Sequence, residues 1–251
     1  WMRGASAASG VRMRTWPRCV LAGLAVTNMN WKRCSATNFV AMAALAPAPQ
    51  DGPDLWRQMG QRGSADYSGR LYRLCANHTV YDACNFAVPA NDFSPLCASC
   101  RQTRVLPDLS EPANLGRWKQ IESAKRQLFY TLARLGLEPA PGRAGPVFEF
   151  LADWPGGPPI LTGHHGGTIT LNVAEADDGE RAQRRVALGE PYRTLIGHLR
   201  HESGHFYWDQ LVRDGHRLEA FRSVFGDERL DYAAALSAHY AKGNDLGDWR
   251  Q

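Results

Sequence analysis

The sequence predicts an α+β fold, in which a small cysteine-rich module precedes a larger domain of helices and a short sheet. Three observations predict it. Four cysteines fall within residues 75–100, a stretch with too little core to fold without a metal or disulfides. Three later segments carry apolar residues at helical spacing. Two short segments between the first and second of these are rich in β-prone residues.

Size and composition are those of a globular protein. The 251 residues allow one large domain or two smaller ones, and an apolar fraction of 44% is ample for a core. The net charge of +4 is too small to indicate nucleic acid as a partner. No apolar run approaches the roughly 18–20 residues that cross a bilayer, so no membrane association is expected. The chain begins with Trp1 and ends at Gln251 without a terminating element, so we expect a longer natural protein.

Residues 1–54 are expected to form a poorly defined N-terminal segment. The apolar run 19–26 follows basic residues, as in a signal peptide, but it is short and no small-residue cleavage site follows it. We therefore expect no secretory signal and a cytoplasmic location. Ala and Pro dominate residues 41–54, which predicts a linker.

The cysteines of the next stretch are candidate ligands of a structural zinc ion: Cys75, Cys84, Cys97 and Cys100. The last two form a C-x-x-C turn that can grip one metal, and the first two complete a tetrahedron. Two disulfides or a redox C-x-x-C are the alternatives. Disulfides are disfavoured without a secretory signal, and this Pro-, Asn- and Asp-rich stretch lacks the βαβ context of a redox motif. Four thiolates close the coordination shell, so this zinc would build structure and not catalyse.

Regular elements follow the cysteines. Apolar spacing predicts a core-packing helix over residues 110–137. Residues 147–151 and 168–173 are predicted strands, because both are short and β-prone. Between them, glycines flank His164 and His165, which predicts a solvent-facing turn and not a metal site.

The motif H-E-x-x-H, from His201 to His205, is the candidate catalytic site. It lies in residues 195–212, whose apolar spacing predicts a helix. The two histidines then project about 40° apart and one turn apart along the axis, so both can bind one Zn²⁺. Glu202 lies on the neighbouring face and can act as general base towards a water at the metal. The alternative is a solvated helix with two surface histidines.

Three features weigh against that alternative. The flanks of the motif are apolar and helical, which favours a core-facing helix over a loop. Gly204 costs a helix about 1 kcal/mol relative to Ala, which predicts a close packing contact at this position. The aromatic run 206–208 follows at once and can wall a cleft.

A third protein ligand is expected from another element, because His201, His205 and Asp209 span about 12 Å along a straight helix and cannot converge on one ion. His198 is too far along the axis from His205 to share its ion, so it is interpreted as a packing residue or one outside the ligand shell. Trp208 and Leu211 occupy the glycine and final histidine positions of the extended zincin motif, which excludes that class. A predicted helix within residues 219–240 offers acids instead. Its candidate ligands, with surface or capping roles as the alternative, are Glu228 and Asp231.

Several motifs, in one order, resemble those of a bacterial family of zinc-binding metallopeptidases with an N-terminal zinc-ribbon-like domain. They lie at residues 74–77, 84–85, 88–90, 96–101, 107–110, 161–164, 169–172 and 189–195, followed by 201–209. The resemblance covers roughly residues 70–250. It implies His201 and His205 as zinc ligands, Glu202 as catalytic acid and base, and the four cysteines as part of the zinc ribbon.

The resemblance also implies an order of domains. We expect a degenerate ribbon remnant with a linker at 1–54, a zinc-ribbon-like module at 55–109, and a zincin-like metallopeptidase domain, incomplete at its C-terminus, at 110–251. The family opens with paired C-x-x-C motifs, of which Cys19 and Cys34 alone remain here. It also continues past Gln251 with an acidic helix that looks like the source of the third ligand.

The expected function is zinc-dependent hydrolysis of a peptide or protein substrate, with one catalytic and one structural Zn²⁺. The strand at 168–173 is expected to run along the cleft and pair with the substrate backbone. Tyr192 and Tyr207 are candidates for the oxyanion donor, with core or rim packing as the alternative. The competing hypothesis is a binding module, in which the ribbon docks a protein or nucleic acid and the H-E-x-x-H helix is not catalytic.

Overall fold

The structure is a computed structural model that describes residues 40–59, 70–137, 139, 144–188, 194–231 and 234. These residues belong to two compact units, one within Met29–Tyr207 and the other within Trp208–Gln251. The α+β fold class predicted from the sequence is confirmed. Predictions for the apolar run 19–26, Cys19, Cys34 and Tyr192 concern positions outside the described residues.

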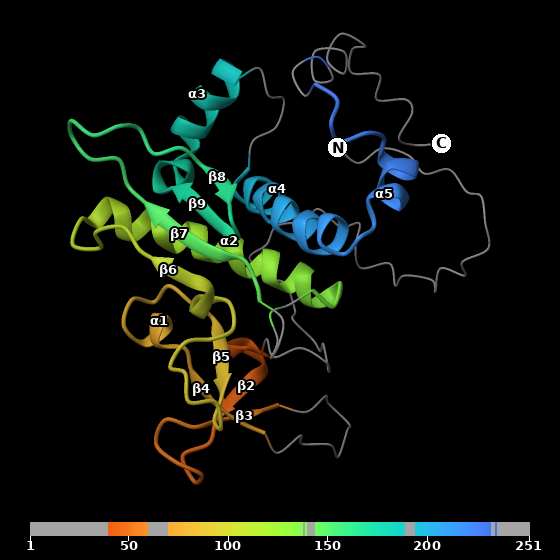
Figure 1. The fold of residues 1–251 in the computed structure, drawn as a ribbon. Helices are drawn as coiled ribbons and strands as arrows, with labels where there is room; N and C mark the ends of the chain where they lie inside the picture. Colours follow the sequence, from red (N-terminus) through yellow and green to blue (C-terminus); the bar gives the residue numbers. More distant parts are fainter. Residues whose placement is uncertain are drawn as a thin grey trace, which may run out of the picture. The chain divides into compact units, whose positions relative to one another are not determined.

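An antiparallel sheet of five short strands carries the cysteines, in the order β1-β5-β4-β3-β2 (Figure 1). The strands are β1 (Val40–Ala41), β2 (Leu45–Pro47), β3 (Trp56–Gln58), β4 (Leu71–Leu74) and β5 (Phe86–Pro89). The 3-10 turn η3 (Met42–Ala44) joins β1 to β2, and the single helical turn α1 (Ala76–Thr79) lies between β4 and β5.

The linker predicted at residues 41–54 is wrong. This segment contains β2, which pairs with β3 through three residue pairs, and the end of β1, which pairs with β5. Leu45, which pairs with Gln58, and Ala48, which directly follows β2, are both buried. The Ala- and Pro-rich composition that indicates a linker is also compatible with very short edge strands, and only the partner strands decide between the two.

A second, four-stranded sheet has the order β6-β7-β9-β8. Its strands are β6 (Thr103–Val105), β7 (Val147–Leu151), β8 (Gly163–His165) and β9 (Thr168–Asn172). The strands β6, β7 and β9 run parallel, and β8 pairs antiparallel with β9 at the edge. The 3-10 turn η4 (Cys100–Gln102) leads from the last cysteine into β6, so the two sheets follow each other directly in the chain.

Both strands predicted from the sequence are therefore confirmed, as β7 and β9. The predicted turn at His164 and His165 is wrong, because both residues lie in β8 and pair with β9. The turn itself is made by Gly166 and Gly167, whose φ angles of +54° and +85° suit glycine.

Helices cover the second sheet, as Figure 1 shows. The predicted helices at 110–137 and at the motif are confirmed as α2 (Pro112–Arg134) and α4 (Leu195–Trp208), and the charged stretch 178–188 forms α3 (Asp178–Leu188). The 3-10 turn η5 (Val173–Ala176) connects β9 to α3. The fully buried core of the sheet and α2 consists mainly of Trp118, Ile121, Phe129, Phe148, Phe150, Ile169 and Leu171.

The cysteine-rich sheet and the second sheet belong to one packed unit, because α2 contacts both. Tyr81 lies edge-on to Trp118 of α2, with 5.4 Å between ring centroids. Arg126 of α2 is buried and donates to the carbonyl oxygen of Ala83 at 2.7 Å.

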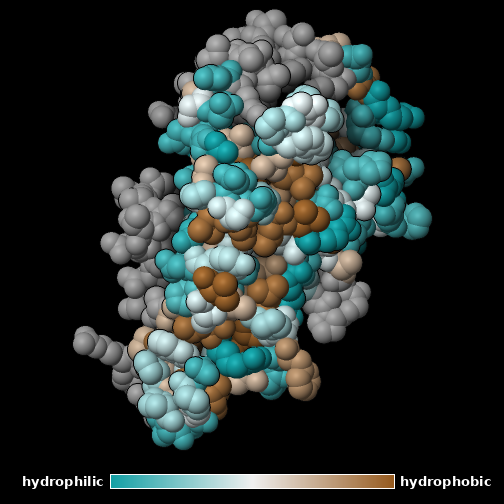
Figure 2. All heavy atoms as spheres, turned by 90° about the vertical axis from the view of Figure 1, so that its left-hand side faces the viewer, coloured by the Kyte–Doolittle hydropathy of each residue, from teal (hydrophilic) through white to brown (hydrophobic). Residues whose placement is uncertain are grey.

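Figure 2 shows hydrophobic surface gathered along the middle of one face. On the β7–β8 connection, Trp154 and Leu161 are exposed.

The C-terminal unit is short in its described part. A π-helical turn, η6 (Asp209–Arg213), follows α4, and the helix α5 (Leu218–Phe225) comes next. The helix predicted within 219–240 is thus wrong in extent, because Gly226, with a φ of +87°, ends α5. Among the described residues, no helix combines the length and the apolar character that a bilayer crossing requires.

Candidate metal centres

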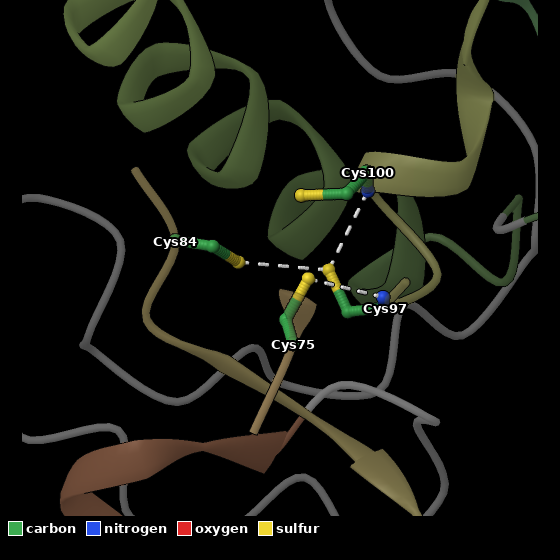
Figure 3. Close-up of side chains that lie close together, drawn as sticks. All are labelled: Cys75, Cys84, Cys97 and Cys100. Atoms are coloured by element: carbon green, nitrogen blue, oxygen red, sulfur yellow. Dashed lines mark hydrogen bonds between the residues drawn. The ribbon is translucent and has the colours of Figure 1, made fainter. Parts of the chain in front are cut away.

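The four cysteines converge on one point, as Figure 3 shows. Their sulfur atoms all lie within 4.8 Å of one another. Cys75 directly follows β4, Cys84 precedes β5, and the turn from Cys97 to Cys100 leads into η4. The ends of β4 and β5 and the turn that enters η4 therefore bring together residues that are up to 25 positions apart in the chain.

The cluster fits a tetrahedral zinc ion better than disulfides. The Sγ atoms of Cys84 and Cys97 are 3.7 Å apart, close to the separation of about 3.8 Å that follows from Zn–S bonds of about 2.3 Å. A disulfide needs about 2.05 Å. All four residues are buried and none is disulfide-bonded. Three backbone N–H groups donate to sulfurs at 3.4 Å, from Phe86 to Cys84, from Cys97 to Cys75, and from Cys100 to Cys97.

The thiols interact strongly with one another. Hydrogen bonds from the thiols of Cys100, Cys84 and Cys97 lower the pKa of Cys75 far below its usual range. The same contact with Cys75 raises the pKa of Cys100, as do its contacts with Cys84 and Cys97 and its burial. The pKa of Cys84 is also lowered, chiefly by its hydrogen bond with Cys100, whereas the neighbouring thiols and burial keep the pKa of Cys97 raised, as they do for Cys100. The cluster therefore favours thiolates at Cys75 and Cys84 and resists ionisation of the other two cysteines. Four thiolates therefore require a multivalent cation among them.

The motif helix α4 separates its residues between two faces. Leu199, Ser203 and Phe206 are buried, whereas His201 and His205 are exposed. The two imidazoles turn towards each other, with 3.1 Å between their Nε2 atoms. Two nitrogens bound to one tetrahedral zinc at about 2.0–2.1 Å would lie about 3.3 Å apart. The pair can thus hold one ion, and half-buried Glu202 follows the first histidine directly.

The strand β8 places His164 beside this pair, although the sequence around His164 predicts a solvent-facing turn. The ring of His164 lies parallel to that of His205, with 6.2 Å between centroids, and edge-on to Phe206 at 6.3 Å. The backbone N–H of Gly167 donates to His164 Nε2 at 3.2 Å. His164 is half-buried and its neighbour His165 is exposed, as expected from the alternation of a strand. Glycines are typical of turns, so the glycines on either side of the two histidines led to the prediction of a turn and not of a strand.

The third ligand is not found among the described residues, where the four cysteines are the one group of three or more potential ligands. Glu228 accepts hydrogen bonds from Arg222, at 2.9 Å from Nε, and Asp231 accepts the backbone N–H of Ala234 at 2.7 Å. These contacts agree with the surface and capping alternatives for the two acids.

Tyr207 and His198, on either side of the motif, have structural contacts. The hydroxyl of Tyr207 donates to the carbonyl oxygen of Leu137 at 2.7 Å and the ring is buried, so core packing, and not an oxyanion role, describes it. His198 Nδ1 lies 3.6 Å from buried Glu175, as expected for a packing residue. The close contact predicted at Gly204 is wrong, because the residue is exposed and an added Cβ would meet no described atom within 4 Å.

Comparisons with known proteins indicate zinc binding. A family described as "Putative zinc-binding metallo-peptidase" matches residues 114–251, which is more than half of the chain, and a zinc-ribbon domain family matches residues 24–111. Uncharacterized proteins of Mycobacterium bovis and Mycobacterium tuberculosis are 41% identical over 181 residues, covering 70% of this chain and 52% of theirs. The chain thus spans about half the length of these curated relatives. No solved structure matches it.

Proposed function

Because the chain belongs to this family of zinc-binding metallopeptidases, we propose that it hydrolyses peptide bonds at the site of His201, Glu202 and His205. The observation that carries the proposal is the convergence of the two Nε2 atoms to 3.1 Å on an exposed helix face. The third protein ligand, in this proposal, comes from outside the described residues, in the last part of the chain or beyond Gln251.

The residues of the site divide the chemistry between them. His201 and His205 hold the ion, and Glu202 accepts a proton from the attacking water and passes it to the leaving amine. A zinc ion, when bound, supplies an electrophile for the scissile carbonyl and lowers the pKa of a bound water towards about 7. Leu199 and Phe206 are buried and anchor α4, the helix that carries the two imidazoles.

We propose that an extended substrate pairs with β8 (Gly163–His165). The expectation that the strand at 168–173 pairs with the substrate is wrong, because β9 already pairs with β7 on one side and β8 on the other. β8 is the edge of the sheet, so its outer backbone groups suit strand addition. It also carries His164, the residue beside His205.

The four-cysteine site is proposed to hold a second, structural zinc ion. Its closed set of thiolates leaves no position for substrate. The proposal keeps the cytoplasmic location expected from the sequence, because a zinc site of four thiolates requires cysteines that stay reduced. The substrate is proposed to be a peptide or protein, without a role for membrane or nucleic acid.

The general base is tested by Glu202→Gln. This change keeps the shape of the side chain but removes its proton acceptor, so we expect hydrolysis of a quenched fluorescent peptide library to vanish while zinc content is unchanged. Glu111→Gln, at an exposed acid that precedes α2 and makes no side-chain capping bond, is the matched control and should behave as the parent protein. Hydrolysis by Glu202→Gln at the parental rate would falsify the assignment.

Metal counting separates the peptidase from the alternative, a zinc-ribbon binding module. The proposal expects two zinc ions per chain by elemental analysis and the loss of one in His201→Ala. The exposed His165→Ala, on β8, is the control and should retain both. One zinc ion per chain that is insensitive to His201→Ala would favour the module.

A further inference from the structure

A buried ion pair lies directly beneath the four-cysteine site. Glu122 and Lys125 of α2 are both completely buried, and Lys125 Nζ lies 2.7 Å from Glu122 Oε1. Removing two charges from water is costly, and breaking such a pair is costlier still. Neither residue belongs to the proposed catalytic site, so the pair calls for another role.

The pair connects the cysteines to the core of the second sheet. Glu122 Oε2 accepts from the Cys100 thiol at 3.9 Å, and the hydroxyl of Thr103 donates to Glu122 Oε1 at 2.9 Å. Lys125 also donates to the Thr103 hydroxyl. Its ammonium lies 5.4 Å and 5.3 Å from the ring centroids of Phe148 and Phe150, the buried residues of β7.

The charges of a loaded site explain why this arrangement needs a cation. A divalent ion with four thiolates carries a net charge of −2, here in a buried place. Three of the sulfurs receive a backbone N–H among the described residues. Cys100 instead faces a carboxylate, whose charge would repel its thiolate unless a nearby cation offsets it. Lys125 is the buried cation at that position.

We propose that Lys125 is a positioning residue for the metal of the four-cysteine site. The positive charge of Lys125 offsets the negative charge of Glu122, so the carboxylate can lie beside Cys100 without repelling its thiolate. Lys125 thereby sets the metal affinity of the four-cysteine site. Outer-shell partners of metal ligands typically change affinity by about 10- to 100-fold when they are removed. This inference does not depend on peptidase activity.

The test uses the full chain and two substitutions with opposite effects on charge. Lys125→Met keeps the length of the side chain and leaves the carboxylate unbalanced, so we expect zinc affinity to fall by about 10- to 100-fold. Glu122→Gln removes the repelling charge and keeps the cation, so affinity should be equal or higher. Lys119→Met, at a half-buried lysine of the same helix, is the matched control and should bind as the parent does.

Affinity is measured by competition with a chelator, and cobalt substitution identifies the site, since thiolate-to-cobalt charge-transfer absorption reports cysteine-bound metal and not metal at the histidines. A purely structural pair predicts that both single variants lose metal together, because each leaves a buried charge unpaired. That result, or a Lys125→Met variant with parental affinity, overturns the proposal. If Lys125→Met does not fold, the direction of the change in Glu122→Gln still decides.

Discussion

Individual side chains of the motif helix have opposite environments at neighbouring positions. His201 and His205 are exposed and face each other, while Ser203 and Tyr207 between and after them are buried. The exposed position of Gly204 has a consequence for stability. Glycine on a helix surface loses backbone entropy on folding without a contact that requires it.

We predict that Gly204→Ala stabilises the protein by up to about 1 kcal/mol, the difference in helix propensity between the two residues. Chemical denaturation of the zinc-loaded protein measures the free energy of unfolding. Gly179→Ala, at another exposed helical glycine with no described atom near its added Cβ, is a useful comparison. A marked loss of stability in Gly204→Ala would show a close contact at this position after all.

Among the elements, α2 joins the two sheets. Its Glu122 contacts a cysteine, its Trp118 contacts Tyr81, and its Phe129 packs against Phe148 of β7. The polar contact from Arg126 to the carbonyl of Ala83 is buried. A buried carbonyl that loses its donor costs free energy. The contact from Arg126 to Ala83 should therefore contribute measurably to the free energy of unfolding.

We predict that Arg126→Met lowers the free energy of unfolding by about 1–3 kcal/mol, the usual cost of a buried acceptor left without its partner. Denaturation midpoints in urea provide the measurement. Arg134→Met, at an exposed position in the last turn of α2, should change little. Equal midpoints for the two variants would mean that the contact to Ala83 adds nothing to stability.

At the scale of the whole molecule, metal and fold are coupled within the unit Met29–Tyr207. Ala83, just before Cys84, belongs to the same hydrophobic cluster as Trp118 and Phe148. The cysteine site also has little apolar core of its own, chiefly Phe86 and Val88. Small metal modules draw their folding free energy from the bound ion. Loss of the ion should therefore destabilise the packing of α2 as well.

We predict that zinc removal raises the hydrogen exchange rates of the amides in β7 and β9 as well as those of the amides in β4 and β5. Faster exchange confined to β4 and β5 would show that the ribbon folds independently of the sheet.

Acid should promote metal loss, as a chelator does. The raised pKa of Cys100 means that its thiol is protonated when no metal is bound. Metal release therefore takes up protons, and a lower pH favours metal release.

The sequence by itself determined what depends on local geometry. The C-x-x-C turn and the H-E-x-x-H spacing need only a turn and a helix to bring their ligands together, and the long apolar periodicities of α2 and α4 predict helices without knowledge of their partners. The strands β7 and β9 followed from their β-prone residues.

Only the tertiary structure decided the pairing of segments with loop-like composition. β2 and β8 are rich in Ala, Pro, Gly or His, and they are strands because β3 and β9 pair with them. The position of His164 beside His205 and of Lys125 beneath the cysteines follows from those pairings and from α2 packing. Such contacts join residues far apart in the chain, and their free energy depends on burial, which no local pattern of residues specifies.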